Sequence, residues 1–268
     1  QTFYQLNRAR SYPDYTAALA TYGSPAQNFI FADNEQDVAI WPNGRFPLKW
    51  RDQGKFILDG TDPAYDWQGW IPADQNPIVK NPPRGFVSSA NQFSTDKTYP
   101  YYLNWQFAPG ERGRRINERL TAMTKATPDS LRALQNDNLN LRATDALPTL
   151  LALVQTQSLQ ADQVVALETV KKWSHRNDVN EIGPTIFTLW AEKLMETIWN
   201  DEFDGGDSLP MRYPSFDRTL LMLQRDTAAR WFDNVKTPVR ESIKEVVTNT
   251  LKAACDSLTR AYGPLSKT

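Results

Sequence analysis

The spacing of hydrophobic and polar positions changes near residue 108 of the chain. Before that point, turn-forming residues separate short apolar runs, which predicts strands over residues 28–30, 38–41 and 85–89. The sequence Pro42-Asn43-Gly44 is typical of a hairpin end. An alanine-rich stretch over residues 14–22 predicts a short helix that Asp14 caps. The sequence therefore predicts a strand-rich part over residues 1–108.

After residue 109, hydrophobic residues recur every three or four positions, which is the period of an α-helix with one buried face. Thr237 followed by Pro238 is a candidate cap for the last helix. We expect five to seven helices over residues 109–268, and an α+β fold class for the whole chain. The predicted buried faces comprise Ile116, Leu120 and Met123; Val164, Leu167, Val170 and Trp173; Ile186, Trp190, Leu194 and Ile198; Ile243, Val247, Leu251, Ala254 and Leu258.

Composition narrows the class of protein. Hydrophobic residues make up 40% and charged residues 23% of the 268 residues, which is ordinary globular usage. The 30 Lys and Arg residues are balanced by 31 Asp and Glu residues, so the positive excess that nucleic-acid binding requires is missing. No apolar run approaches the roughly 20 residues of a membrane-spanning helix. We expect neither a nucleic-acid nor a membrane partner.

Metal and thiol chemistry find little support in the sequence. The single cysteine, Cys255, excludes an internal disulfide and a multi-cysteine metal site. The single histidine, His175, excludes an all-His metal site, and we expect it at the surface near a helix end. Four acidic residues, Asp201, Glu202, Asp204 and Asp207, lack the spacing of a calcium-binding loop and predict an exposed acidic turn.

The strongest functional pattern lies in residues 81–92, Asn-Pro-Pro-Arg-Gly-Phe-Val-Ser-Ser-Ala-Asn-Gln. It ends a strand-like run on the carboxamide of Asn91, which is suited to hydrogen-bonding a reacting oxygen. Other segments accompany it in order: Gln-Asn-Phe-Ile-Phe-Ala-Asp at 27–33, Gly-Arg-Phe-Pro at 44–47, Tyr-Asp-Trp-Gln-Gly-Trp-Ile-Pro at 65–72 and Gly-Glu-Arg-Gly-Arg-Arg-Ile at 110–116. With these segments in this order, the chain resembles the penicillin acylase (penicillin amidase) family of N-terminal-nucleophile hydrolases.

The resemblance implies an interior piece of the large β-subunit of such an enzyme. It implies a partial αββα architecture, with a strand-rich part over 1–108 carrying the oxyanion motif and a mainly helical region over 109–268. In this family the nucleophile is the first residue of the β-subunit, and its own α-amine acts as the base. Residue 1 here is Gln, which has no nucleophilic oxygen or sulfur. We therefore expect an upstream nucleophile, and no activity from this chain alone.

Two residues carry the predicted site. By the resemblance, Asn91 is the asparagine whose side-chain N–H donates to the oxyanion, and Arg112 is the arginine beside it. The alternatives are that Asn91 only stabilises a turn and that Arg112 is a solvated residue at a helix start. Arg115, three residues further on, ranks below Arg112 as a site residue. The residue after Asn91 is Gln92, where many relatives have a second Asn.

The resemblance also implies substrate, partners and compartment. The substrate would be a small N-acyl amide, such as a β-lactam with its side chain or an acyl-homoserine lactone. The partners would be the α-subunit and the remaining β-subunit segments of one precursor, in the periplasm or outside the cell. We expect no cofactor; some relatives bind structural calcium, but Tyr101 and Tyr102 stand where one carboxylate ligand would fall.

Two other functions remain open from the residues alone. The chain contains nine Trp, ten Tyr and twelve Phe, which could form a non-catalytic aromatic platform that binds a glycan or a peptide. It could also be a degenerate relative that keeps the fold and has lost the nucleophile. Replacement of Asn91 distinguishes these functions from an amidohydrolase, because only the amidohydrolase needs this carboxamide for turnover.

Overall fold

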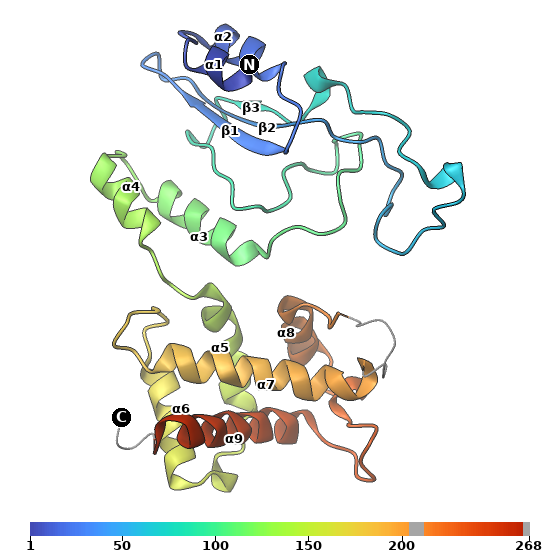
Figure 1. The fold of residues 1–268 in the computed structure, drawn as a ribbon. Coiled ribbons are helices and arrows are strands. Elements are labelled where there is room, and N and C mark those ends of the chain that lie inside the picture. The colour runs from blue at the N-terminus through green and yellow to red at the C-terminus, as the bar shows by residue number, and fades with distance from the viewer. Residues whose placement is uncertain (204–211, 265–268) are drawn as a thin grey trace. The chain divides into compact units, whose positions relative to one another are not determined.

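The computed structural model describes residues 1–203 and 212–264 of the chain. It divides into two compact units, Gln1–Gln135 and Asn136–Thr268 (Figure 1). The first unit contains the sheet and helices α1 to α4, and the second contains helices α5 to α9. The change of composition near residue 108 coincides with the start of α3 (Gly110–Thr121), whereas the compact units divide after Gln135.

The first unit is built on a three-stranded antiparallel sheet with strand order β1-β2-β3. The strands are β1 (Gln27–Ala32), β2 (Val38–Asn43) and β3 (Val79–Lys80), so the strands predicted over residues 28–30 and 38–41 are confirmed. Helices α1 (Thr2–Leu6) and α2 (Tyr12–Leu19) lie beside the sheet (Figure 1). Their contact is a small core of Tyr15, Leu19 and Trp41, packed against residues that include Phe29 and Phe31.

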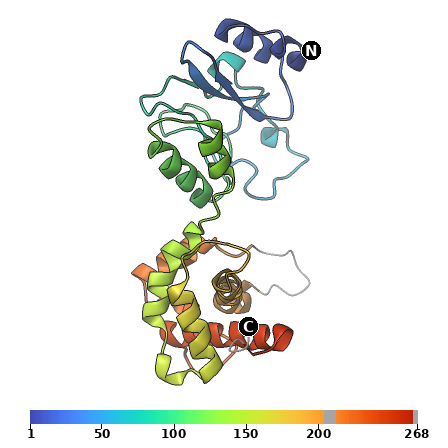
Figure 2. The ribbon, with the colours of Figure 1, turned by 90° about the vertical axis from the view of Figure 1, so that its left-hand side faces the viewer.

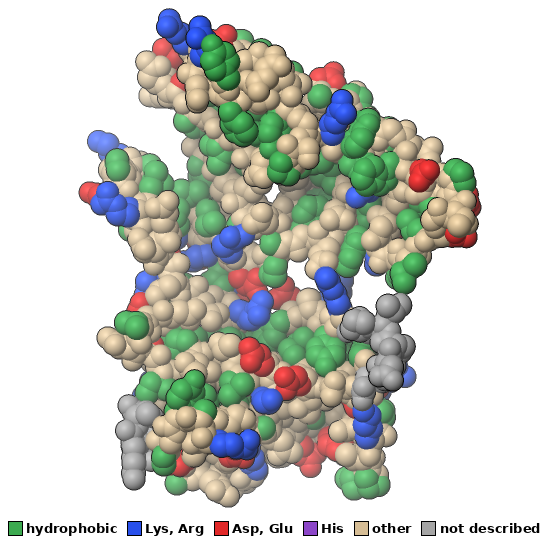
Figure 3. Space-filling model, viewed as in Figure 1, with side chains coloured by type: hydrophobic (Ala, Val, Ile, Leu, Met, Phe, Trp, Pro, Cys, Tyr) green, Lys and Arg blue, Asp and Glu red, His purple; other side chains and the backbone are tan. Residues whose placement is uncertain are grey.

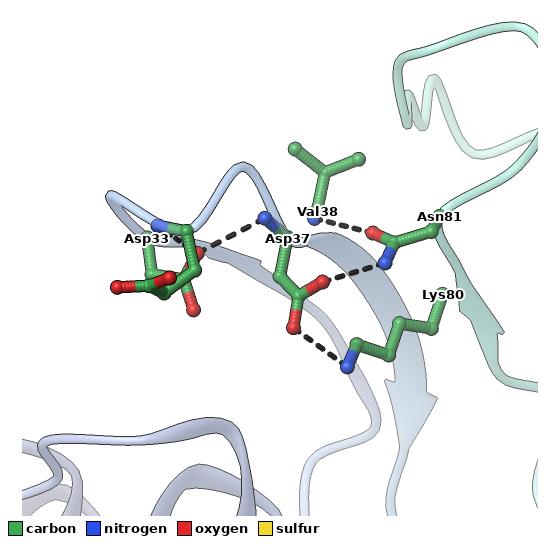
Figure 4. Close-up of polar contacts among 6 residues, drawn as sticks. Asp33, Asp37, Val38, Lys80 and Asn81 are labelled. Carbon is green, nitrogen blue, oxygen red and sulfur yellow. Dashed lines mark hydrogen bonds and ion pairs between the residues drawn. The ribbon is translucent and has the colours of Figure 1, made fainter.

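A polar network joins the β1–β2 turn to β3 (Figure 4). The Asp37 carboxylate accepts hydrogen bonds from Lys80 and from the Asn81 side chain, both at 2.6 Å, and these bonds lower the pKa of Asp37. The Asn81 carboxamide also accepts a bond from the Val38 amide at 2.8 Å. The network therefore fixes the point from which the chain continues through Pro82 and Pro83 toward Asn91.

Three local predictions in the first unit are wrong. Residues 85–89 form no strand, because a strand needs a backbone partner and their assigned contact with β1 is through side chains, from Asn28 to Ser89 at 2.7 Å. The hairpin turn between β1 and β2 lies at residues 33–37, whereas Pro42 and Asn43 are the last two residues of β2 and Gly44 directly follows the strand. The cap of α2 is Ser11, which accepts from the Asp14 amide at 3.2 Å.

The second unit is all-helical among its described residues. Its helices are α5 (Leu141–Leu153), α6 (Ala161–Lys172), α7 (Gly183–Phe203), α8 (Phe216–Arg225) and α9 (Ile243–Tyr262). With α3 and α4 (Pro128–Gln135), the described residues after 109 form seven α-helices, in the predicted range. Helix α7, which Figure 2 views almost end-on, packs along α9. Trp190 is fully buried there and donates to the Val247 carbonyl oxygen at 3.2 Å.

The helical periods predict some buried faces better than others. All the predicted core residues of α7 and α9 are buried, whereas Ile116, Leu120 and Met123 are only partly buried. In α6 the prediction for Val164 is wrong, because it is exposed and the buried face includes Gln163, whose side chain also caps the helix start. The cap of α9 is Ser242 with Glu245, rather than the predicted Thr237-Pro238 pair.

Large hydrophobic side chains are exposed on the first unit, as the green side chains in Figure 3 illustrate. Ile57 is 85% exposed, Phe56 is 71% exposed and Trp67 is 57% exposed. Phe56 and Ile57 are adjacent in the sequence, and their exposed side chains are available for contact with another polypeptide segment. Within residues 1–203 and 212–264, no helix has the length and apolar character to cross a membrane.

Candidate active site

The structure brings Asn91 and Arg112 together, although 21 positions separate them in sequence. The Arg112 guanidinium donates through Nη2 to the Asn91 side-chain oxygen at 2.5 Å and to the Ala90 carbonyl oxygen at 2.9 Å. Arg112 lies in the first turn of α3, where the macrodipole disfavours a cation. The two bonds to the Asn91 segment offset that disadvantage, so Arg112 has specific hydrogen-bond partners although it is exposed.

The Asn91 backbone adopts a left-handed conformation with φ of 62°, which few residue types other than glycine and asparagine tolerate. Its carbonyl oxygen accepts a bond from the Ala108 amide at 2.9 Å. The side chain itself is exposed. The segment therefore holds the Asn91 backbone in place while leaving its carboxamide at the surface.

The orientation of the Asn91 carboxamide decides what it can do. Because its oxygen accepts from Arg112, its nitrogen is directed away from the guanidinium and carries two N–H donors. Among the described residues, no acceptor is assigned to that nitrogen. A charged donor on the amide oxygen also polarises the amide and strengthens its N–H groups as donors. The Asn91 carboxamide therefore presents its N–H groups at the surface, where a ligand or another polypeptide segment could accept from them.

Helix α3 also hydrogen-bonds the segment that precedes Asn91, through Asn117. The Asn117 side-chain oxygen accepts from Ser88 at 2.9 Å and from Arg84 at 3.3 Å. Arg84 also donates to the Phe86 carbonyl oxygen at 2.9 Å. No motif in the sequence singles out Asn117, because Ser88 and Arg84 lie 29 and 33 positions away and become its neighbours only in the folded chain.

The other candidate residues lie outside this cluster. Arg115 faces Glu118 on its own helix at 3.4 Å. His175 follows α6 and its ring contacts the Thr144 hydroxyl at 3.0 Å, so it is half-buried in the second unit. Asp201 accepts from the Val235 amide at 2.8 Å, while Asp204 and Asp207 lie outside the described residues.

The aromatic segment before α3 is tied to Gln75. The Tyr99 hydroxyl donates to the Gln75 carbonyl oxygen at 3.0 Å, and the Tyr101 hydroxyl bonds to the Gln75 side-chain oxygen. Burial raises the pKa of Tyr99 and of Tyr102, so both phenols are protonated at neutral pH. Within the described ranges there is no group of three or more His, Cys, Asp and Glu residues that could hold a metal ion. The expectation that the chain needs no metal stays a prediction.

Comparison with known proteins shows which family the chain is similar to. The family model described as penicillin amidase matches residues 1–268. An acyl-homoserine lactone acylase QuiP of Pseudomonas putida is 24% identical over 273 residues, covering 95% of this chain and 33% of that protein. Penicillin G acylase of Escherichia coli is 27% identical over 205 residues, covering 70% of this chain and 23% of that protein.

The fold is similar to that of a solved member of this group. A thermostable penicillin G acylase from Alcaligenes faecalis superposes with a TM-score of 0.69 at 16% sequence identity, covering 98% of this chain and 52% of that chain. This confirms the predicted α+β, partial N-terminal-nucleophile hydrolase fold. The chain spans about a third of the length of the QuiP relative. Because the family model matches from the first residue to the last, the chain belongs to the penicillin amidase family.

Proposed function

We propose that this chain is part of an amidohydrolase that cleaves the linear amide of an N-acyl compound, with Asn91 as an oxyanion donor. The observation that carries the proposal is the bond from Arg112 to the Asn91 side-chain oxygen, which directs the two N–H donors of the carboxamide away from Arg112, with no acceptor assigned to them among the described residues. An oxyanion hole needs such donors, fixed before the reaction starts. An asparagine that only stabilised a turn would instead bond its own backbone.

The chemistry follows from the charge that develops during amide hydrolysis. A nucleophile supplied by a segment outside this sequence attacks the amide carbon, and the carbonyl oxygen becomes negative. Asn91 stabilises that oxygen through its N–H groups, while Arg112 holds the carboxamide and adds a positive charge nearby. One such donor typically contributes about 100-fold to 1000-fold to turnover.

Substrate and partners follow from the relatives and the surface. The matched relatives are named as acylases of penicillin G and of acyl-homoserine lactones, which share an acyl group in linear amide linkage to an amine. We propose a substrate of this class. The exposed Phe56, Ile57 and Trp67 support a contact with further segments of the same precursor. By family resemblance we propose a periplasmic or secreted location.

Replacement of Asn91 by Ala in the full-length gene product that contains this sequence tests the proposal. Turnover of linear N-acyl amides, assayed as phenylacetyl and straight-chain acyl amides of a chromogenic amine, should fall about 100-fold to 1000-fold. Mass spectrometry establishes whether the precursor has matured, and thermal unfolding whether it is folded. The matched control is Asn34→Ala, which removes an exposed asparagine from the β1–β2 turn. Turnover within about threefold of the parent in mature, folded N91A would refute the oxyanion role.

A further inference from the structure

Gln92, directly after the proposed oxyanion donor, makes an unusual local contact. Its side-chain oxygen accepts a hydrogen bond from the Ala90 amide at 2.5 Å, so the side chain folds back across Asn91. Gln92 is half-buried, whereas Asn91 is exposed. The Gln92 side chain is therefore directed toward the protein, whereas the neighbouring Asn91 side chain is directed toward solvent.

Both backbone polar groups of Ala90 are hydrogen-bonded. Its N–H donates to Gln92, and the Ala90 carbonyl oxygen accepts from Arg112 at 2.9 Å. The Asn91 carbonyl oxygen is held in turn by Ala108. The Asn91 backbone has φ of 62°, a left-handed conformation that asparagine tolerates. The bond from the Ala90 amide to Gln92 and the bond from the Ala108 amide to Asn91 lie on either side of this residue and hold the turn in that conformation.

Helix α3 provides a surface against which Gln92 lies. A Cβ atom placed on Gly113 would lie 3.5 Å from the Gln92 side-chain oxygen and 3.8 Å from the Ala90 Cβ. Gly113 follows Arg112, so two consecutive residues of α3 face the Asn91 turn. Arg112 holds the Asn91 side chain, and Gly113 leaves between α3 and the Gln92 side chain only the room that one added Cβ would fill. The backbone around Asn91 therefore lies between the Gln92 side chain and the start of α3.

We propose that Gln92 is a positioning residue that acts through Asn91, by fixing the turn from which the Asn91 carboxamide donates to the oxyanion. This inference rests on the proposed function of Asn91. Removing the bond to Ala90 lets the turn relax and misplaces the donor, and a displacement of about 1 Å can cost roughly 100-fold in rate. Substrate binding depends on other contacts, so the loss falls on kcat rather than on KM.

A double-mutant cycle in the full-length gene product tests this role. Gln92→Met keeps the length of the side chain and removes the acceptor, and it is measured alone and combined with Asn91→Ala. In the parent background, kcat should fall about tenfold with KM within about twofold. In the N91A background the same change should alter kcat by less than about twofold, because no donor remains to be misplaced. A purely structural role would reduce activity equally in both backgrounds.

The control is Gln68→Met, the same substitution at an exposed glutamine that bonds the backbone two residues earlier, from Nε2 to the Asp66 carbonyl oxygen at 3.0 Å. It should leave kcat unchanged. Equal losses in both backgrounds, or no loss in the parent background, overturn the role of Gln92 while leaving that of Asn91 intact. Unchanged turnover in N91A overturns both. If Q92M does not mature to a folded protein, Gln92→Ala removes the same acceptor with a smaller side chain and is judged by the same outcomes.

Discussion

A close approach between Gly183 and Trp173 in the second unit predicts a large effect of a small substitution. Gly183 is the first residue of α7, and it lies against the buried side chain of Trp173, which follows α6. A Cβ atom on Gly183 would lie 2.5 Å from Cγ of Trp173 and 2.7 Å from its Cβ. Contacts this short are not tolerated, so Gly183→Ala forces the indole or the start of α7 to move.

The magnitude follows from what holds the indole. The Trp173 ring nitrogen donates to the Arg176 carbonyl oxygen at 2.6 Å, and its ring packs against Phe187 with 6.1 Å between centroids. Overpacking a core costs about 1–3 kcal/mol. Losing the bond to Arg176 adds about 1 kcal/mol, and the lower flexibility of Ala in the unfolded chain returns about 0.5–1 kcal/mol. We expect G183A to lower the free energy of unfolding by about 1–3.5 kcal/mol, with a central value of about 2 kcal/mol.

Urea denaturation followed by far-ultraviolet circular dichroism measures this change, because most of the helices lie in the second unit. With a slope of about 1–3 kcal/mol per molar urea, the midpoint should fall by roughly 1–2 M. The control is Gly60→Ala, where the added Cβ meets no atom within 4 Å. The clash is tested directly by repeating G183A in a Trp173→Leu background, where it should cost much less. An equal cost in both backgrounds, or no cost in the parent, would refute the reasoning.

Two further predictions concern Arg112 and Cys255. Arg112→Lys keeps the positive charge but replaces Nη2, which bonds both oxygens from a rigid planar guanidinium, by a freely rotating ammonium on a shorter side chain. Turnover of the full-length gene product should therefore fall about tenfold. Arg115→Lys is the matched control, and equal effects would contradict the role of Arg112. Burial raises the pKa of Cys255 from 9.0 to about 11, so at pH 8 the thiolate fraction is about 100-fold lower than in the unfolded chain. Mass spectrometry measures how fast iodoacetamide alkylates Cys255. Alkylation should be slow in the folded chain at pH 8, faster as the pH approaches 11, and fast in urea. Rapid alkylation of the folded protein at pH 8 would contradict the burial of Cys255.

The elements that the sequence predicts best are the long helices of the second unit. The faces of α7 and α9 follow directly from hydrophobic residues spaced three or four apart, because helical geometry alone brings such positions to one side. The family and its α+β fold also follow from ordered motifs in the sequence. These predictions depend on residues that are near one another along the chain.

Neighbouring residues that can each cap a helix compete for that position, which explains the two wrong cap predictions. Ser11 caps α2 in place of Asp14, and Ser242 caps α9 in place of Thr237. All are residue types that favour caps, and the choice between them depends on where the helix first packs against its neighbours. Val164 is exposed for a related reason, since the face that α6 buries is set by the helices around it.

By itself, the sequence determined the family and the helical periods, because each is carried by nearby residues or by an ordered motif, and it predicted Asn91 and Arg112 as site residues. Only the tertiary structure decided that Arg112 donates to the side-chain oxygen of Asn91, that the Gln92 side chain accepts from the Ala90 amide, and that residues 85–89 pair with no strand. Hydrogen bonds between residues 21 positions apart depend on the path of the backbone between them. That path is fixed by the packing of α3 against the Asn91 turn, which no local pattern encodes.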